Sequence, residues 1–206
     1  MTDATDLATM FAMHGSDKDT NGYTSLYHAL FTPLKHSPIK LLEIGVGTMI
    51  PGAPSSMKGY MSDSYQPGAS LRAWRDFFPN GEIHGMDIQP DCMLNEHRIT
   101  THLCNSTNAQ NCKAWIDAHP TLTFDIIIDD GSHWDLHQLD TLKNLFPLVK
   151  PGGFYVIEDV MINLLVSRKP NQVIEIVGDS GVFFAGLKNN LCVIHKLPLQ
   201  RCRDHL

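Results

Sequence analysis

The sequence predicts an α/β fold: a seven-stranded, mostly parallel sheet with helices on both faces and an antiparallel hairpin at one edge. Strand-like segments alternate with helix-like segments along most of the 206 residues, which is the pattern of a parallel sheet with helical crossovers. Segment 126–128 consists of three isoleucines, as expected for a strand that is buried on both faces. The last two strand-like segments have no long helix between them, which predicts the hairpin.

The individual elements follow from hydrophobic periodicity and from the positions of Pro and Gly. Residues 1–36 are predicted to form a helical cap on a core at 37–206, and both belong to a single domain over 1–206. Strands are predicted at 39–44, 82–88, 98–103, 124–128, 153–157, 172–178 and 190–196. Helices are predicted at 4–13, 23–35, 68–78, 108–118 and 136–148. The segment 49–68 is predicted to be a long loop, which in a compact domain is usually functional or mobile.

Composition excludes several classes of protein. Apolar residues make up 43% of the chain and charged residues 18%, which is ordinary for a globular domain. The net charge of −6 argues against nucleic acid as a partner, because such a protein needs a basic face. Five cysteines without a CxxC pair favour a reducing compartment. Without an apolar run of about 20 residues or a signal peptide, we expect a cytoplasmic protein with no membrane partner.

Two pairs of acidic residues end two predicted strands. Asp129 and Asp130 follow the isoleucines, and Glu158 and Asp159 follow the next strand along the chain. If these strands are neighbours, about 5 Å apart, four carboxylates converge, and they repel one another unless a cation or a proton intervenes. Magnesium or calcium suits such oxygen ligands. Adjacent Asp129 and Asp130 must point in different directions, which predicts two separate roles for them.

Structural roles compete with these functional ones. Asp is favoured as a helix N-cap, so either acid pair alone is better explained as a cap. Two pairs on successive strands favour a metal site instead. His133 lies within a turn of the first pair and is suited to accept a proton near neutral pH, although it could also cap a helix or pair with a carboxylate.

A second motif indicates a nucleoside ligand. Glu43, Gly45 and Gly47 end the first predicted strand, and the two glycines admit a ligand close to the main chain. No third glycine opens a helix at once, so a dinucleotide pyrophosphate is not expected. Asp87 ends the second strand, where a carboxylate can accept hydrogen bonds from both hydroxyls of a ribose.

These motifs, taken in order, resemble those of class I S-adenosylmethionine-dependent methyltransferases. The resemblance is closer to one branch, the metal-dependent sugar O-methyltransferases of the macrolides mycinamicin and macrocin. It is carried by residues 15–18 with 22–23, 41–47, 68–74, 78–79, 126–133 and 155–159. The strings IIIDDGSH at 126–133 and IED at 157–159 are the specific part of the match.

The resemblance implies a Rossmann-like methyltransferase fold, with S-adenosylmethionine and Mg²⁺ or another divalent cation as cofactors. The implied acceptor is a hydroxyl of a sugar, such as rhamnose, in a glycoside or glycan. The residues implied in cofactor binding are Glu43, Gly45, Gly47, Ser70, Asp87, Asn105 and Asp129. The implied metal ligands are Asp130, Glu158 and Asp159, and His133 acts as the base together with Asp130.

Two other classes stay open at this point. An iron-dependent hydroxylase of the same fold could use His133, Asp130 and Asp159 as a redox metal triad. A protein that only binds the cofactor would not need this set of acids and histidine. Lys18 and Tyr23 match the branch motif, and the sequence leaves open whether they contact a ligand or stabilise a turn.

Overall fold

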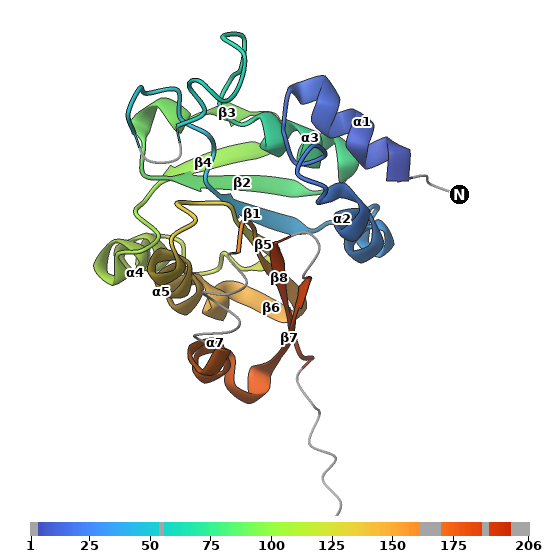
Figure 1. The fold of residues 1–206 in the computed structure, drawn as a ribbon. Helices are drawn as coiled ribbons and strands as arrows, with labels where there is room; N and C mark the ends of the chain where they lie inside the picture. The colour runs from blue at the N-terminus through green and yellow to red at the C-terminus, as the bar shows by residue number, and fades with distance from the viewer. Residues whose placement is uncertain (1–3, 54–55, 161–169, 187–189, 199–206) are drawn as a thin grey trace, which may run out of the picture.

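The sheet of the protein has eight strands, and six of them match predicted segments. The computed structural model describes residues 4–53, 56–160, 170–186 and 190–198. The strands are β1 Lys40–Ile44, β2 Glu82–Asp87, β3 Asn95–Glu96, β4 Ile99–Leu103, β5 Phe124–Asp129, β6 Val149–Ile157, β7 Gly181–Gly186 and β8 Leu191–Lys196. They form one sheet in the order β3-β4-β2-β1-β5-β6-β8-β7 (Figure 1). The two strands that were not predicted are β7 and the two-residue edge strand β3, which pairs antiparallel with β4.

Helices cover both faces of this sheet, as predicted. The α-helices are α1 Ala4–His14, α2 Thr24–Phe31, α3 Ala69–Phe77, α4 Ala109–Ala118, α5 Asp135–Leu145 and α7 Pro170–Val177. Short 3₁₀ turns are η1 Thr32–Leu34, η2 Pro90–Cys92, η3 Phe146–Leu148 and η4 Gly178–Ser180. Residues of α1, α2 and α3 pack in one buried cluster, and residues of α4, α5 and α7 pack in the other (Figure 1). None of the described helices has the length and apolar character needed to span a bilayer.

The isoleucines of β5 explain how one strand serves both cores. Ile126 and Ile128 belong to the cluster beneath α1, α2 and α3, whereas Ile127 belongs to the cluster beneath α4, α5 and α7. All three side chains are fully buried. Successive residues of a strand point to opposite faces, so a central parallel strand needs an apolar residue at every position.

The C-terminal hairpin is confirmed, but one of its predicted strands is wrong. The segment predicted as a strand at 172–178 is helix α7, and the strand that pairs antiparallel with β8 is β7. The β-branched residues of the segment favour a strand, but Val173 and Val177 have helical i, i+4 spacing. Both are buried against the sheet, whereas Ile174 is exposed, so packing on one helical face overrides the strand propensity.

The register of the parallel strands places the functional motifs at one edge. Ile44 at the end of β1 lies opposite Met86 of β2 and Asp129 of β5, and Asp129 lies opposite Ile157 of β6. The carboxyl ends of four neighbouring strands therefore align. In open α/β sheets, ligands bind at this edge, where the strand order reverses.

Candidate functional site at the carboxyl edge of the sheet

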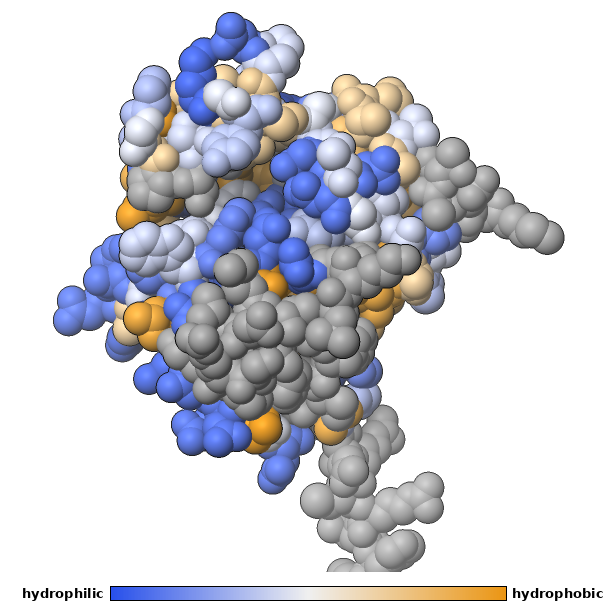
Figure 2. Space-filling model, viewed as in Figure 1, coloured by the Kyte–Doolittle hydropathy of each residue, from blue (hydrophilic) through white to orange (hydrophobic). Residues whose placement is uncertain are grey.

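A cavity of about 840 Å³ opens at the carboxyl ends of the central strands. This volume is within the usual range of ligand-binding cavities, about 300–1,000 Å³. Hydrophilic residues gather at the centre of the face that shows this region (Figure 2). The predicted site residues that line the cavity are Gly45, Gly47, Ser70, Asp87, Asn105, Asp129, Asp130, His133 and Asp159.

Two glycines form one wall of the cavity because a side chain does not fit there. Gly45 and Gly47 have φ angles of +88° and +90°. A Cβ atom on Gly45 would lie 2.0 Å from the carbonyl oxygen of Asp130, and one on Gly47 would lie 2.2 Å from the hydroxyl oxygen of Tyr65. Only glycine adopts this backbone without strain and permits this approach.

Asp87 holds this turn in place. Its Oδ2 accepts a hydrogen bond of 2.8 Å from the backbone N–H of Val46, and its Oδ1 accepts one of 2.8 Å from the N–H of Gln89. The carboxylate thereby ties the end of β2 to the turn after β1 while facing the cavity. A carboxylate has about four acceptor sites, so Asp87 can accept further hydrogen bonds from a ligand.

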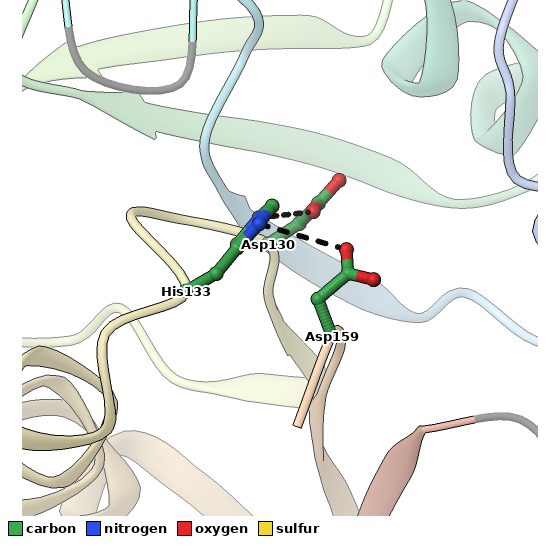
Figure 3. A group of neighbouring side chains, drawn as sticks. All are labelled: Asp130, His133 and Asp159. Carbon is green, nitrogen blue, oxygen red and sulfur yellow. Dashed lines mark hydrogen bonds and ion pairs between the residues drawn. The ribbon is translucent and has the colours of Figure 1, made fainter. Parts of the chain in front are cut away.

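Three side chains at the mouth of the cavity form what we call the outer group: Asp130, His133 and Asp159. Ligand atoms of all three lie within 4.8 Å of one another (Figure 3). His133 Nε2 is 3.2 Å from Asp130 Oδ1, and His133 Nδ1 is 3.7 Å from Asp159 Oδ2. Tyr23 donates a hydrogen bond of 2.6 Å to the second oxygen of Asp159. The side chains remain 25–38% exposed, so this group is open to a ligand.

Both the backbone and the electrostatics of the outer group are unusual. His133 and Asp159 have φ angles of +61° and +50°, which are uncommon for residues other than glycine. Such strain is found mainly at functional sites. Burial alone would lower the pKa of His133, but its hydrogen bond to Asp130 and the charges of Asp130 and Asp159 outweigh this effect and raise the pKa.

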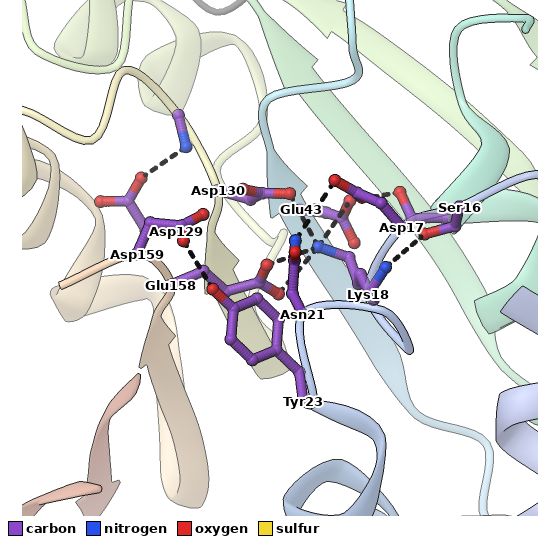
Figure 4. A network of polar contacts seen from close by, with 12 residues as sticks. Ser16, Asp17, Lys18, Asn21, Tyr23, Glu43, Asp129, Asp130, Glu158 and Asp159 are labelled. Carbon is purple, nitrogen blue, oxygen red and sulfur yellow. Dashed lines mark hydrogen bonds and ion pairs between the residues drawn. The ribbon is translucent and has the colours of Figure 1, made fainter. Parts of the chain in front are cut away.

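Behind it lies an inner group, consisting of Lys18, Glu43 and Glu158, which is at most 1% exposed (Figure 4). Lys18 Nζ donates to both oxygens of Glu158 at 2.8 Å and to Asp130 Oδ2 at 2.7 Å. The same nitrogen is 3.7 Å from Glu43 Oε1. Burial would lower the pKa of Lys18, but the surrounding carboxylates raise it well above its usual value, so the ammonium stays charged.

Glu43 and Glu158 do not line the cavity but lie behind it. Glu43, predicted to contact the cofactor, accepts hydrogen bonds from Ser70 and, at 2.6 Å, from Trp74 Nε1. Glu158, predicted as a metal ligand, is bound by Lys18 and by the hydroxyl of Tyr27. These donors come from α2, α3 and the turn before α2, which the strand pattern alone does not reveal.

Several residues that line the cavity had no assigned role in the sequence. Lys18 shares its wall with Ser16, Asp17 and Asn21 from the turn between α1 and α2 (Figure 4). Ser16, Asp17 and Lys18 belong to the GSDK string of the family resemblance, which is their only signal in the sequence, and Asn21 has none. Tyr65 reaches the cavity from the predicted long loop, which thus forms a wall of the site.

The charges of the site suit cationic ligands. Lys18 pairs with three carboxylates, those of Glu43, Asp130 and Glu158, and Asp129 and Asp159 add two more at the same strand ends (Figure 4). Burial raises the pKa of Asp129 to about 7, and together with the charge of Asp130 it raises that of Glu158. Despite burial, the charge of Lys18 lowers the pKa of Asp130 in the same cluster, but burial outweighs it at Glu158. The oxygen-rich composition of the cluster fits a hard divalent cation such as Mg²⁺, and a sulfonium cofactor suits the same field.

Comparisons with known proteins relate the chain to enzymes that methylate sugars. No protein-family model matches the chain. The chain is 40% identical, over 157 residues, to an 8-demethyl-8-(2-methoxy-α-L-rhamnosyl)-tetracenomycin-C 3′-O-methyltransferase of Streptomyces olivaceus, covering 75% of this chain and 37% of the relative. It is 39% identical, over 140 residues, to the mycinamicin VI 2″-O-methyltransferase of Micromonospora griseorubida, covering 67% of this chain and 31% of the relative.

A solved structure extends the similarity to the fold. The MycE methyltransferase from the mycinamycin biosynthetic pathway, in complex with Mg, SAH and mycinamycin VI, matches with a TM-score of 0.74 and 26% identity. The match covers 96% of this chain and 56% of that one. This chain spans only 31–37% of the length of the two curated relatives. Within the matched part, the predicted fold class and the resemblance to sugar O-methyltransferases are confirmed.

Proposed function

We propose, from the similarity of this chain to the O-methyltransferases of natural-product sugars, that it transfers a methyl group from S-adenosylmethionine to a sugar hydroxyl. The proposed acceptor is a deoxyhexose such as rhamnose in a glycoside or glycan, and a divalent cation assists the reaction. The observation that carries the proposal is the outer group, in which two carboxylates and an imidazole converge beside the glycine turn. Relatives named for methylation of rhamnosyl groups support the choice of acceptor.

The cofactor is proposed to lie along the glycine turn. Gly45 and Gly47 leave room for it against the backbone, and Asp87 accepts hydrogen bonds from its ribose hydroxyls. Asn105 and Asp129 line the same part of the cavity and complete the proposed contacts. Ser70 contributes indirectly, because its hydroxyl donates to Glu43. S-adenosylmethionine supplies an electrophilic methyl group, so the protein has to position and deprotonate the acceptor.

Asp130 and Asp159 are the proposed ligands of a magnesium ion. When bound, Mg²⁺ supplies positive charge that stabilises a developing alkoxide on the acceptor. Glu158, the predicted third ligand, is the neighbour of Asp159 in sequence but has both oxygens on Lys18. We therefore propose that Glu158 orients Lys18 and the acids beside it. Glu158 could bind the metal ion only if it left this ion pair.

His133 is the proposed general base. In the tautomer with its hydrogen on Nε2, His133 donates to Asp130 Oδ1, and Nδ1, which lies 3.7 Å from Asp159 Oδ2, has a lone pair that can accept a proton. An imidazole oriented by a carboxylate is a recurrent arrangement for proton transfer. In this arrangement the proton of the acceptor hydroxyl moves to Nδ1 as the oxygen attacks the methyl group.

The iron-dependent hydroxylase is less well supported. The outer group has the three ligating residues that such an enzyme needs, but it has one imidazole and two carboxylates. The facial triad of non-haem iron oxygenases has two imidazoles and one carboxylate. Two carboxylates with a single imidazole fit Mg²⁺ better than iron, because Mg²⁺ prefers oxygen ligands.

The decisive experiment measures methyl transfer from labelled S-adenosylmethionine to a panel of rhamnosides and other deoxysugar glycosides. We expect labelled methyl ether on at least one glycoside, loss of transfer in EDTA, and recovery on addition of Mg²⁺. Binding of S-adenosylhomocysteine should persist in EDTA, because the proposed cofactor contacts do not include the ion. Transfer that is indifferent to EDTA, or a chain that does not bind S-adenosylhomocysteine, would contradict the proposal.

A further inference from the structure

Lys18 is a buried cation for which the proposed reaction has no use. Its side chain is 1% exposed, and lysine is almost never buried this fully unless it is paired. An ammonium has three N–H donors, and those of Lys18 reach Asp130 and Glu158, with Glu43 at 3.7 Å. Lys18 thus contacts acids from the ends of three different strands, β1, β5 and β6.

Asp130 connects this ammonium to the outer group. Its Oδ2 accepts from Lys18 Nζ at 2.7 Å, and its Oδ1 lies 3.2 Å from His133 Nε2. The Asp130 carboxylate therefore binds Lys18 through Oδ2 and faces the proposed metal site with Oδ1. A lysine at this place holds Asp130 in one orientation, and it also brings a positive charge close to the divalent ion.

We propose that Lys18 is a positioning residue that acts as a permanent internal cation, neutralising the inner group so that one divalent ion at the outer group completes the site. This inference rests on the metal site of the proposed function. In this role the ammonium occupies the position that a second metal ion would otherwise take between the inner acids. It also repels the bound ion, which keeps the ion exchangeable.

This role predicts an effect of opposite sign from that of a merely structural lysine. If Lys18 only maintained the shape of the site, its removal would disorder Asp130 and weaken metal binding. If Lys18 acts through its charge, its removal leaves more negative charge around the outer group, and a divalent ion binds more tightly. The protein without metal becomes less stable at the same time, because buried carboxylates lose their partner.

The test measures Mn²⁺ binding to the whole chain. The electron paramagnetic resonance signal of free Mn²⁺ reports how much of the ion is bound. We expect one ion bound per chain in the wild type and binding that is tighter by about tenfold or more in Lys18→Met. Lys18→Arg keeps the charge and should bind Mn²⁺ as the wild type does. Lys35→Met is the matched control, because Lys35 pairs with Asp6 in the same N-terminal region but away from the acids.

Thermal unfolding supplies a second readout that does not depend on turnover. The melting temperature of Lys18→Met should fall most in EDTA, and Mn²⁺ should raise it by more than it raises that of the wild type. If Lys18→Met does not fold, Mn²⁺ binding is measured instead on the charge-compensated variant Lys18→Met/Glu43→Gln. Removing one cation and one anion together should leave Mn²⁺ affinity within a fewfold of the wild type, and loss of binding there overturns the inference.

The outcomes separate the two proposals. If the wild type binds no Mn²⁺, the metal site itself is wrong. If the wild type binds one ion and Lys18→Met binds it equally or more weakly, the metal site stands and the role of Lys18 as an internal cation is wrong. Unequal binding by Lys18→Arg and the wild type, beyond about tenfold, would also overturn it, because charge alone would then not account for the effect.

Discussion

The inner and outer groups are built from the same strand ends, yet they differ in burial and in hydrogen bonding. Inner acids Glu43 and Glu158 have donors from Ser70, Trp74 and two other side chains, and neither lines the cavity. Outer acids are partly exposed, and two of the three outer residues have a strained backbone. The inner acids lie behind the cavity, whereas the outer acids line it.

This difference shows that an acid cluster read from a sequence contains two kinds of residue. Glu158 and Asp159 are consecutive, but they face different groups because neighbouring residues at a strand end point in different directions. We expect substitutions of the inner acids to change mainly stability, and substitutions in the outer group to change mainly activity. The predictions below test this division.

The largest expected effect comes from the outer group. His133→Ala should lower kcat by about 10²–10⁴, because it removes the proposed proton acceptor. The stability of the variant should stay within about 0.5 kcal/mol of the wild type, since the side chain is partly exposed. Steady-state kinetics and urea unfolding measure the two quantities. His137→Ala, at a histidine that also lines the cavity, is the matched control and should retain most activity. A His133→Ala enzyme with near-normal kcat would show that His133 is not the general base.

The inner group should show the reverse pattern. Glu43→Ala leaves the indole N–H of Trp74 and the hydroxyl of Ser70 without their acceptor, and it removes a charge near Lys18. Breaking such a buried network costs about 3–5 kcal/mol. Urea unfolding should show a loss of this size, whereas Asp159→Ala should lose less than about 1 kcal/mol. Equal losses in the two variants would mean that burial does not divide the cluster as proposed.

The sequence was sufficient to predict the outer group because its members lie in one local pattern. Asp130 and His133 are three residues apart, and the parallel strands β5 and β6 bring Asp159 to them. The same alternation predicted that Asp129 and Asp130 would separate, and Asp129 is indeed buried beside the Gly131 N–H while Asp130 faces His133. Strand order and apolar patterning carry this information.

The inner group could not be predicted in the same way. Lys18 and Asp130 are 112 residues apart in sequence, and Tyr27 and Glu158 are 131 apart. Their contacts depend on how the turn after α1 and helix α2 pack against the sheet, and no local pattern records this packing. Helix α7 was mispredicted for a related reason, because burial of Val173 and Val177 decided between two possible periodicities.

Two neighbouring histidines outside the acid cluster also make the stability of the protein depend on pH. His84 Nδ1 lies 3.0 Å from His102 Nε2, and burial lowers the pKa of both residues to about 4. The unfolded value is about 6.5, so this pair contributes stability that is complete above pH 6.5 and is lost as the pH falls towards 4. Carboxyls with raised pKa, such as Asp129, contribute in the opposite direction.

His84→Phe should separate these two contributions. Phenylalanine keeps a ring against His102 and Phe124 but does not titrate. Relative to the wild type, the variant should lose about 1–2 kcal/mol less free energy of unfolding between pH 7 and pH 5. Urea unfolding at a series of pH values provides the measurement, and His36→Phe, at an exposed histidine, is the control. Parallel pH curves for His84→Phe and the wild type would show that the acids alone set the pH dependence.

The smallest expected effect lies just beyond the outer group, at its exposed rim. Trp134 follows His133, is 70% exposed, and stacks on His137 with ring centroids 5.4 Å apart and an interplanar angle of 19°. An exposed indole supported in this way offers an apolar face to the ring of a sugar, and such aromatic contacts contribute about 1 kcal/mol. Trp134→Ala should therefore raise KM for the glycoside by about three- to fivefold with kcat unchanged. Leu136→Ala, at an exposed apolar residue in the first turn of α5, should leave both constants unchanged. A fall in kcat at constant KM would instead place Trp134 among the groups that position His133, and the boundary of the outer group would move to include it.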